Sequence, residues 1–165
     1  MRINKGVEWA SHACTLLVPL WPDKGLSLSA LAEFHDLPEP YMAKQMQALA
    51  RAGIMVGGRG RGGFYLLAKS PAEITLLDIL LAVDGDEPMF QCKEIRQNGP
   101  CAAKPTDCVV PCNIASGFWR AEEAYRQSLA QIDLASLAGA VAAQLGSDKV
   151  AKAGEWIGAN LRTRA

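Results

Sequence analysis

Apolar residues recur every three or four positions along most of the chain, which is the spacing of helices that bury one side. The first such run extends over residues 5–18, and Pro19 ends it. Its apolar stripe consists of Val7, Ala10, Cys14 and Leu17. Because Cys14 lies on this stripe, we expect it to be a small core residue rather than a reactive thiol.

Two shorter helical segments follow, separated by a tight turn. Ser27 or Ser29 is a suitable cap for the first of them, which ends near His35. The second runs over residues 40–52, with a proline in its first turn and Gly53 after its end. Two helices joined by a turn of three or four residues are the helix-turn-helix pattern.

The second of these helices separates its residues into two faces. Met42, Met46 and Leu49 form an apolar stripe that predicts the buried face. The other face carries hydrogen-bonding and cationic side chains, namely Tyr41, Lys44, Gln47 and Arg51, with Gln45 at the flank. Such side chains read base edges in the major groove of DNA, although an ordinary solvated face has the same composition.

A β-hairpin is predicted next, with apolar arms at 54–56 and 64–67 around a tip of glycine and arginine. Arg59 and Arg61 in that tip are candidates for contacts with phosphates or the minor groove. A hairpin behind a helix-turn-helix is the wing of a winged helix. A further capped helix follows in SPAEITLLDILLAVDG, with Ile74, Leu77, Leu80 and Leu81 expected to face inward.

The remaining chain combines a cysteine-rich loop with a long helix. Ile114, Phe118, Ala121, Tyr125, Leu129 and Ile132 form a longer apolar stripe than a small head needs. We interpret it as a dimerisation helix, and packing against the chain's own head is the alternative. The fold class is therefore mostly α with a small β wing. We expect four parts: a winged helix at 1–85, a cysteine loop at 86–112, a dimerisation helix at 113–132 and helical segments at 133–165.

Composition adds little to this scheme until the charges are divided along the chain. The formal net charge is zero, but residues 1–69 hold eight Lys and Arg against five Asp and Glu, and residues 70–165 hold nine against twelve. This weak asymmetry fits a head that binds nucleic acid. No apolar run reaches the roughly 18 residues of a membrane span, and no signal peptide is visible. We therefore expect a cytoplasmic protein without a membrane partner.

The cysteines are concentrated, because four of the five lie between Cys92 and Cys112. In the cytosol such a cluster more often binds metal or senses redox state than forms stable disulfides. The two histidines have no convincing nucleophile partner and no substrate pocket is indicated. The sequence thus predicts a protein that is not an enzyme and has no small-molecule substrate.

Taken in order, these parts resemble a known family over about residues 1–130. The segments SLSALAEFHDLPEPYMAKQMQALARAGIM, GRGRGGFYLLAKSPAEITLLDILLAVDG and the cysteine loop before a long helix are similar to the bacterial repressors that include IscR, NsrR and RirA. That resemblance implies a homodimeric winged-helix transcription factor that binds a double-stranded DNA operator. Many members of the family carry an iron–sulfur cluster whose state sets DNA binding.

Within the family, VEWA, AEFHD, CKEIRQNGP and CNIA most resemble the redox-sensing RsrR type. The resemblance implies a 2Fe–2S cluster held by Cys92, Cys112, His35 and Glu8. It leaves open whether Glu8 serves its own subunit or the partner. Trp9, beside Glu8, is a candidate relay of the switch, and a buried anchor is its simpler interpretation.

The residues alone do not decide which of the loop cysteines are the ligands. The spacing Cys92-x8-Cys101-x6-Cys108 approximates the three-cysteine pattern of the family and leaves Cys112 spare. Cys112, however, falls in the first turn of the long helix, where free N–H groups stabilise a thiolate. This position favours Cys112 as a ligand, together with Cys92 at the other end of the loop.

Alternative hypotheses are a structural zinc site on the four loop cysteines, a thiol–disulfide switch, and an electron-transfer protein that only carries a cluster.

Overall fold

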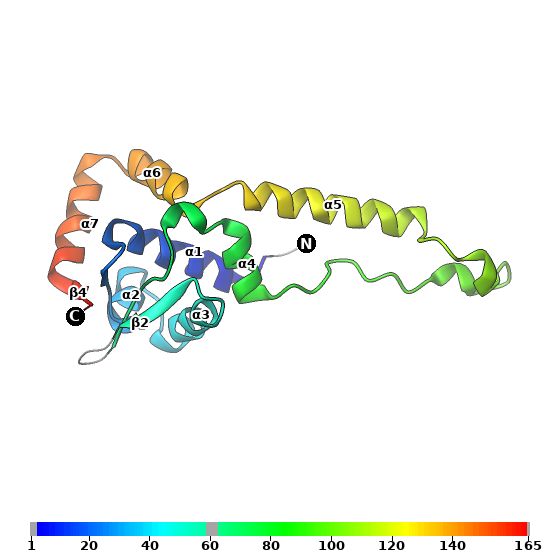
Figure 1. Cartoon of the computed structure of the whole chain (residues 1–165), viewed down its shortest axis with the longest axis horizontal. Helices are drawn as coiled ribbons and strands as arrows, with labels where there is room; N and C mark the ends of the chain where they lie inside the picture. The colour runs from blue at the N-terminus through cyan, green and yellow to red at the C-terminus, as the bar shows by residue number, and fades with distance from the viewer. Residues whose placement is uncertain (1–2, 59–62, 165) are drawn as a thin grey trace. The chain divides into compact units, whose positions relative to one another are not determined.

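The computed structural model describes residues 3–58 and 63–164, which form two compact units (Figure 1). The first unit, called the head, contains the described residues up to Gly85 together with 129–164. The second, called the loop unit, contains 86–128. Within the described ranges, no helix is long and apolar enough to cross a membrane.

Among the described residues, the head holds most of the helices and all four strands. In chain order its elements are α1 (Lys5–Leu17), η1 (Val18–Leu20), β1 (Lys24–Gly25), α2 (Leu28–Phe34), α3 (Glu39–Arg51), β2 (Met55–Gly58), β3 (Phe64–Leu67), η2 (Pro71–Glu73), α4 (Leu76–Asp84), α6 (Leu134–Leu145), α7 (Ser147–Asn160) and β4 (Arg162–Thr163). The loop unit holds η3 (Ile95–Gln97), η4 (Pro105–Asp107) and most of α5 (Asn113–Ala130). The prediction of a mostly helical chain with a small β hairpin is confirmed.

Local capping explains where the helix-turn-helix begins and ends. The Ser27 hydroxyl accepts the N–H of Ala30 at 3.1 Å, so the first of the two predicted caps is the one used. α3 begins at Glu39, one residue earlier than predicted, and Pro40 still lies in its first turn. After α3, Gly53 adopts a left-handed φ of +69°, which a glycine tolerates without steric cost.

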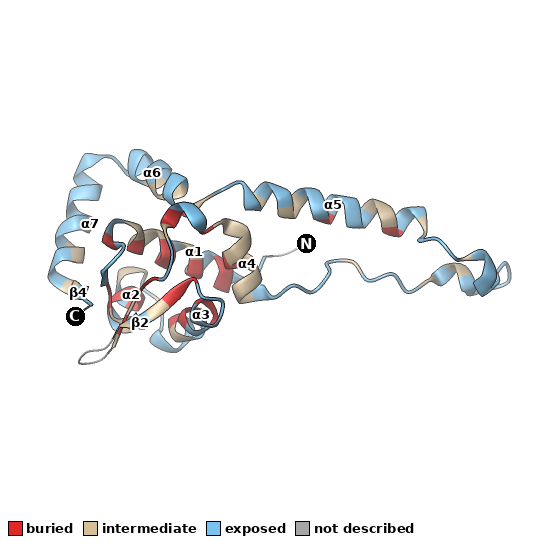
Figure 2. Cartoon of the chain, in the orientation of Figure 1, coloured by how far each residue is buried: buried red, intermediate tan, exposed pale blue. Residues whose placement is uncertain are grey.

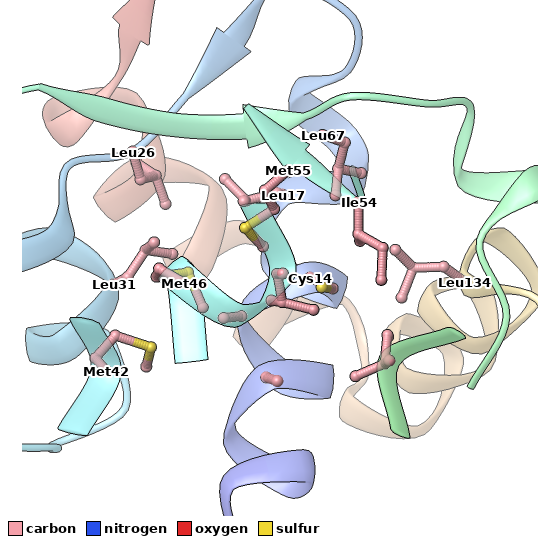
Figure 3. Packing of buried hydrophobic residues seen from close by; sticks show 14 of the residues in the cluster. Cys14, Leu17, Leu26, Leu31, Met42, Met46, Ile54, Met55, Leu67 and Leu134 are labelled. Carbon is pink, nitrogen blue, oxygen red and sulfur yellow. The ribbon is translucent and has the colours of Figure 1, made fainter. Parts of the chain in front are cut away.

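The head is organised around one apolar core (Figures 2 and 3). Helices α1, α3 and α4 contact one another, and α2 packs on α3. Their inward residues are wholly buried, as are those at the start of the hairpin; among them are Cys14, Leu17, Leu31, Met42, Met46, Leu49 and Met55. The burial of Cys14 and of the α3 stripe confirms both predictions.

The wing is an antiparallel hairpin whose sheet is extended by the C-terminus. Strands β2 and β3 pair from Met55–Leu67 to Gly58–Phe64. Leu26 pairs with Tyr65 on the outer side of β3. Just before Leu26, β1 pairs with β4, so the last described residues of the chain lie beside the base of the wing.

Helix α4 buries a different face from the one predicted. Its buried residue is Ile79, with Leu76, Leu80 and Val83 packed against the core, whereas Leu77 and Leu81 are half-buried on another side. Leu77 and Leu81 were therefore wrongly placed in the inward stripe. Nearly every residue of α4 is apolar, so its periodicity does not single out one face.

The C-terminal segments, which had no predicted role, belong to the head. Leu134 at the start of α6 is buried in the core, and α6 contacts α1. In α7, Trp156 packs edge-on against Phe34 of α2, with ring centroids 5.0 Å apart. Ile157 and Leu161 also pack on the core. Residues 133–164 thus pack against α1, α2 and the core of the head.

The loop unit is held by contacts between the start of the cysteine loop and α5. The rings of Phe90 and Phe118 stack with centroids 4.6 Å apart. Trp119 donates its indole N–H to the carbonyl of Phe90 at 3.2 Å. The carboxylate of Glu122, which is almost fully buried, accepts the backbone N–H of Met89 at 3.0 Å.

Candidate functional site

The first candidate surface is the solvent side of α3. Tyr41, Lys44, Gln47 and Arg51 are exposed there, opposite the wholly buried Met stripe. Because the helix is anchored along its whole length on the other side, these four side chains are presented by a rigid element. A cationic and amide-bearing helix face of this kind can donate hydrogen bonds to phosphates and base edges.

Gln45 does not belong to this face, which corrects its prediction as a DNA-contacting residue. It is only 5% exposed, and its side chain packs against Gly6 of α1. A Cβ atom at Gly6 would approach the amide oxygen of Gln45 to 2.7 Å. The amide nitrogen of Gln45 donates to the carbonyl of Tyr41 at 3.4 Å. Gln45 therefore joins α3 to α1 instead of facing solvent.

The second candidate surface is the wing, whose described strands frame its tip. The ring of Phe64 covers Gly58, so closely that a Cβ at Gly58 would overlap it. This contact holds the two strands together where the hairpin leaves the head. Arg59 and Arg61, the predicted wing contacts, lie outside the described residues.

The third candidate group lies on α1 and at the end of α2. Glu8 is exposed in the first turn of α1, which Asn4 caps by accepting the N–H of Gly6 at 2.9 Å. One turn later His12 approaches His35, the residue that ends α2, with ring centroids 5.7 Å apart. The sequence predicts only that His12 is solvated or faces the dimer partner, and its side chain is exposed in this chain. Its position four residues after Glu8, on the same side of a helix, is the signal that points to it.

His35 is the more buried histidine of the pair. Its Nε2 atom is buried and has no hydrogen-bond partner among the described residues. Burial lowers the pKa of His35, and the neighbouring His12 lowers it further. Both effects favour the neutral imidazole, the form that binds metal. A neutral imidazole has one nitrogen with a free electron pair, so His35 is chemically suited to bind a metal ion.

Trp9 lies beside Glu8 and contacts α3. Its ring meets that of Tyr41 edge-on, with centroids 5.9 Å apart. Trp9 is half-buried, so the contact spans from α1 to the exposed face of α3. A displacement of α1 at Glu8 would therefore reach a residue of the candidate DNA-binding face directly.

The four loop cysteines are all free thiols, and two of them are hydrogen-bonded. Cys92 is exposed, and its Sγ accepts the N–H of Glu94 at 3.4 Å. Cys112 is half-buried beside the first turn of α5, and its Sγ accepts the N–H of Ala115 at 3.4 Å. Each of the two predicted thiol ligands therefore accepts one backbone N–H group. Among the described residues, Cys101 and Cys108 receive no such bond.

The donor chemistry of these residues fits an iron–sulfur cluster. Two thiols that accept N–H groups, one unpartnered imidazole and one exposed carboxylate are suitable iron ligands. Within the described ranges, no three His, Cys, Asp or Glu side chains of one chain gather closely enough to hold a metal ion. Glu8 and His35 belong to the head, and Cys92 and Cys112 belong to the loop unit.

The exposed face of α5 is the last candidate surface. Ile114 is 69% exposed and Phe118 is 53% exposed, although both lie on the apolar stripe of the helix. In this stretch Ala115 is wholly buried, so the helix has one covered side and one uncovered apolar side. An uncovered apolar side on a long helix is typical of a subunit interface.

Comparison with known proteins identifies the family of the chain. A model of the Rrf2 family, described as an iron-dependent transcriptional regulator, matches residues 3–140. Among curated relatives, an HTH-type transcriptional regulator of Bacillus subtilis named YwgB is 32% identical over 98 residues, which is 59% of this chain and 63% of YwgB. The chain covers 63%, 45% and 51% of the length of the first three curated relatives it matches.

Solved structures with the same fold include those of two named proteins. T. potens IscR matches with a TM-score of 0.65 and 20% identity, over 89% of this chain and 93% of that one. The oxidized form of Staphylococcus aureus CymR matches with a TM-score of 0.62 and 23% identity, over 84% and 96%. At these identities the likeness shows the fold, and the predicted winged-helix fold class is confirmed. The narrower resemblance to the RsrR type stays a prediction.

Proposed function

The chain belongs to the Rrf2 family of transcriptional regulators, and from that premise we propose that it is a repressor that binds operator DNA as a homodimer. The family confirms the prediction of a regulator rather than an enzyme. The observation that carries the proposal is the exposed polar face of α3 above its wholly buried apolar stripe. It provides the rigid reading element that a winged helix requires.

Each of the four side chains assigned to this face of α3 has a role in this proposal. Lys44 and Arg51 neutralise phosphates or donate to guanine, and Gln47 pairs with an adenine edge. Tyr41, at the N-terminal end of the helix, donates its hydroxyl to a phosphate. Arg59 and Arg61 add wing contacts to the flanking backbone.

The proposed dimer forms through α5. The exposed side chains of Ile114 and Phe118 support a second copy of the chain as the partner that covers them. Two heads held by paired helices would bind two half-sites, which predicts a palindromic operator.

We further propose that a 2Fe–2S cluster tunes this binding, with Cys92, Cys112, His35 and Glu8 as its ligands. Bound there, the cluster supplies one-electron chemistry, and a histidine ligand shifts its potential upward relative to four thiolates. The chain's own contribution is to present two hydrogen-bonded thiols and a neutral imidazole. His12, which contacts His35, is the other imidazole available to such a ligand set. Trp9 is the proposed relay from Glu8 to Tyr41.

The DNA proposal is tested by selecting duplexes from a randomised library and measuring their affinity by fluorescence anisotropy. The triple variant Lys44→Ala, Gln47→Ala, Arg51→Ala should lose at least about a hundredfold in affinity, because three base or phosphate contacts of about 1–3 kcal/mol each are removed. A matched control replaces Lys149 and Lys152, exposed cations of α7, with alanine and should bind normally. Unchanged affinity of the triple variant would remove α3 from the interface.

The cluster proposal is tested on protein purified without oxygen. Iron and sulfide content, visible absorption and operator affinity are measured in the oxidised and reduced states. Cys92→Ser and Cys112→Ser should lose the colour, whereas Cys101→Ser and Cys108→Ser should keep it. A colourless, iron-free wild type, or equal affinities in both states, contradicts the proposal.

A thiol–disulfide switch is the second candidate, and one observation favours it. Cys108 and Cys112 are both free thiols, and only three residues of sequence separate them. Thiol counting and iron analysis after mild oxidation separate the hypotheses. Loss of two thiols without iron supports the switch, and zinc on all four thiols supports a structural site.

A further inference from the structure

Arg96 makes the densest set of polar contacts in the cysteine loop. Its Nε and Nη2 atoms meet the two carboxylate oxygens of Glu94 at 2.5 and 2.7 Å. The same Nη2 donates to the carbonyl of Val110 at 3.0 Å, across fourteen residues of sequence. The side chains of Arg96 and Glu94 are each about one-third exposed, at 31% and 32%. One guanidinium thus joins the early and late parts of the loop.

Glu94 takes an unfavourable backbone conformation at the first of these contacts. Its φ of +49° and ψ of +48° are left-handed, a region that costs a residue with a side chain about 1 kcal/mol or more. In this conformation its N–H points at the sulfur of Cys92, at 3.4 Å. The paired carboxylate compensates for the backbone cost, because Arg96 holds it in two places.

The contact of Arg96 with Val110 lies as near to Cys112 in sequence as its contact with Glu94 lies to Cys92. Val110 precedes Cys112 by two residues, as Glu94 follows Cys92 by two. The pKa of Arg96 is raised chiefly by its bond to Glu94, and also by the nearby thiols of Cys108 and Cys112. The carbonyl of Arg96 accepts the N–H of Ala103 at 2.8 Å, which folds the intervening chain back on itself.

We propose that Arg96 is a positioning residue that, through Glu94 and the Val110 carbonyl, closes the cysteine loop and sets the separation of Cys92 and Cys112. We call the Glu94–Arg96–Val110 arrangement the clasp. This role deepens the proposed function. Only its purpose, which is to position cluster ligands, rests on that function, because the clasp itself is a set of contacts within the loop. Arg96 is not a ligand, because a guanidinium has no electron pair to donate to a metal.

An ordinary surface ion pair would not have this consequence. Exposed pairs contribute about 0–1 kcal/mol and fix little. The clasp differs because the guanidinium is bidentate and also binds a backbone carbonyl remote in sequence. A lysine keeps the charge but has no planar fork to satisfy three acceptors at fixed angles.

The test measures how close Cys92 and Cys112 are held in metal-free protein. In a Cys101→Ser, Cys108→Ser background, the two thiols exchange with oxidised glutathione to give one intramolecular disulfide and two molecules of reduced glutathione. The equilibrium against glutathione yields their effective concentration. Cys14 is wholly buried and does not take part in the native protein.

Arg96→Gln should lower this effective concentration at least about tenfold, and Arg96→Lys should fall between it and the parent. The control Arg120→Gln, at an exposed arginine of α5, should leave it unchanged. An unchanged value in Arg96→Gln overturns the clasp, provided that its urea unfolding midpoint matches the parent's.

Glu94→Gln gives a second, independent variant, because it removes the carboxylate and keeps the side-chain shape. It should move the effective concentration in the same direction as Arg96→Gln, and the double variant should fall no further than Arg96→Gln alone. Additive losses would show that the two residues act separately and would overturn the clasp.

A final measurement keeps this inference distinct from the cluster. If wild-type protein purified without oxygen contains iron, Arg96→Gln should reduce iron per chain at equal total protein, and unchanged iron content would overturn the positioning role. If wild type contains none, the cluster proposal fails, and the glutathione equilibrium alone decides whether the clasp exists.

Discussion

The head and the loop unit are stabilised in different ways. In the head, side chains from α1, α2, α3 and the hairpin are wholly buried in one apolar core. In the loop unit, Ile95, Val109 and Val110 are between 66% and 85% exposed, and the order comes from directional contacts such as those of Glu122 and Arg96. Apolar burial supplies most stability, whereas hydrogen bonds and ion pairs fix geometry at a small net gain.

This difference suits the separate roles proposed for the two units. A reading helix must keep its shape to recognise DNA, and the buried stripe beneath α3 provides that rigidity. In the proposed switch the loop unit must respond to a small change in charge, and a unit held by a few polar contacts can do so. The clasp and the Glu122 contacts are therefore the points at which the loop unit can be altered without unfolding the head.

The thiols provide the largest contrast between the two units. Cys14 is wholly buried in the head, which raises its pKa, whereas Cys101 is exposed in the loop unit. In metal-free native protein, iodoacetamide should modify Cys101 at least about a thousand times faster than Cys14, since Cys14 reacts only when the head opens. Peptide mass spectrometry over time measures both rates. In urea the two rates should converge, and equal native rates would show that the head is loosely packed.

The next prediction compares matched losses of apolar volume. Leu17→Ala in the head removes a wholly buried side chain and should lower the free energy of unfolding by about 2–5 kcal/mol. Ile95→Ala removes a side chain that is 73% exposed and should change it by less than about 0.5 kcal/mol. Urea unfolding followed by circular dichroism measures both. A loss above 1 kcal/mol at Ile95 would mean that a partner surface covers it in solution.

The sequence predicted the head well where polar and apolar residues separate cleanly. In α1 and α3 the stripes through Leu17 and Met46 are the buried ones, and Ser27 is one of the two caps that were expected. It failed in α4, where nearly all residues are apolar and Ile79 could not be told from Leu77. Gln45 was misplaced because its burial depends on Gly6, a small residue on another helix.

The candidate site was only partly accessible to such reasoning. Cys92 and Cys112 were predicted as ligands from their place in the loop and from the expected start of the long helix, which the structure places one residue after Cys112. Their role as ligands stays a prediction. The approach of His12 to His35 joins α1 to the residue that ends α2, and no local pattern encodes a contact between residues so far apart in sequence. The clasp escaped for the same reason, because Arg96 and Val110 are fourteen residues apart and share no periodicity.

A third prediction concerns the polar contacts at the base of the loop unit. Glu122 accepts the N–H of Met89 and pairs with Arg126, which also contacts Asp86. Glu122→Ala leaves both donors without their acceptor, at a cost of about 1–3 kcal/mol, so the Met89 amide should exchange its hydrogen about tenfold faster or more. The control Glu123→Ala removes an exposed neighbour on the same helix. Nuclear magnetic resonance reads the Met89 amide, and equal exchange in the two variants would discount the contact.

The smallest predicted effect is the pH response of the head. Burial and His12 lower the pKa of His35 below its ordinary value of 6.5, so the unfolded chain binds a proton that the folded head does not. Stability contributed by the neutral ring is present above pH 6.5 and is lost as the pH falls below it. In metal-free protein, the free energy of unfolding should therefore fall further in wild type than in His35→Asn when the pH is lowered from about 7.5 to about 5.5. The difference between the two falls should be below about 1 kcal/mol. His12→Asn should give an intermediate fall, because it removes the second cause but leaves the burial. Urea unfolding at both pH values measures the three differences, and a wild type that loses no more stability than His35→Asn would show that the imidazole is protonated equally in both states.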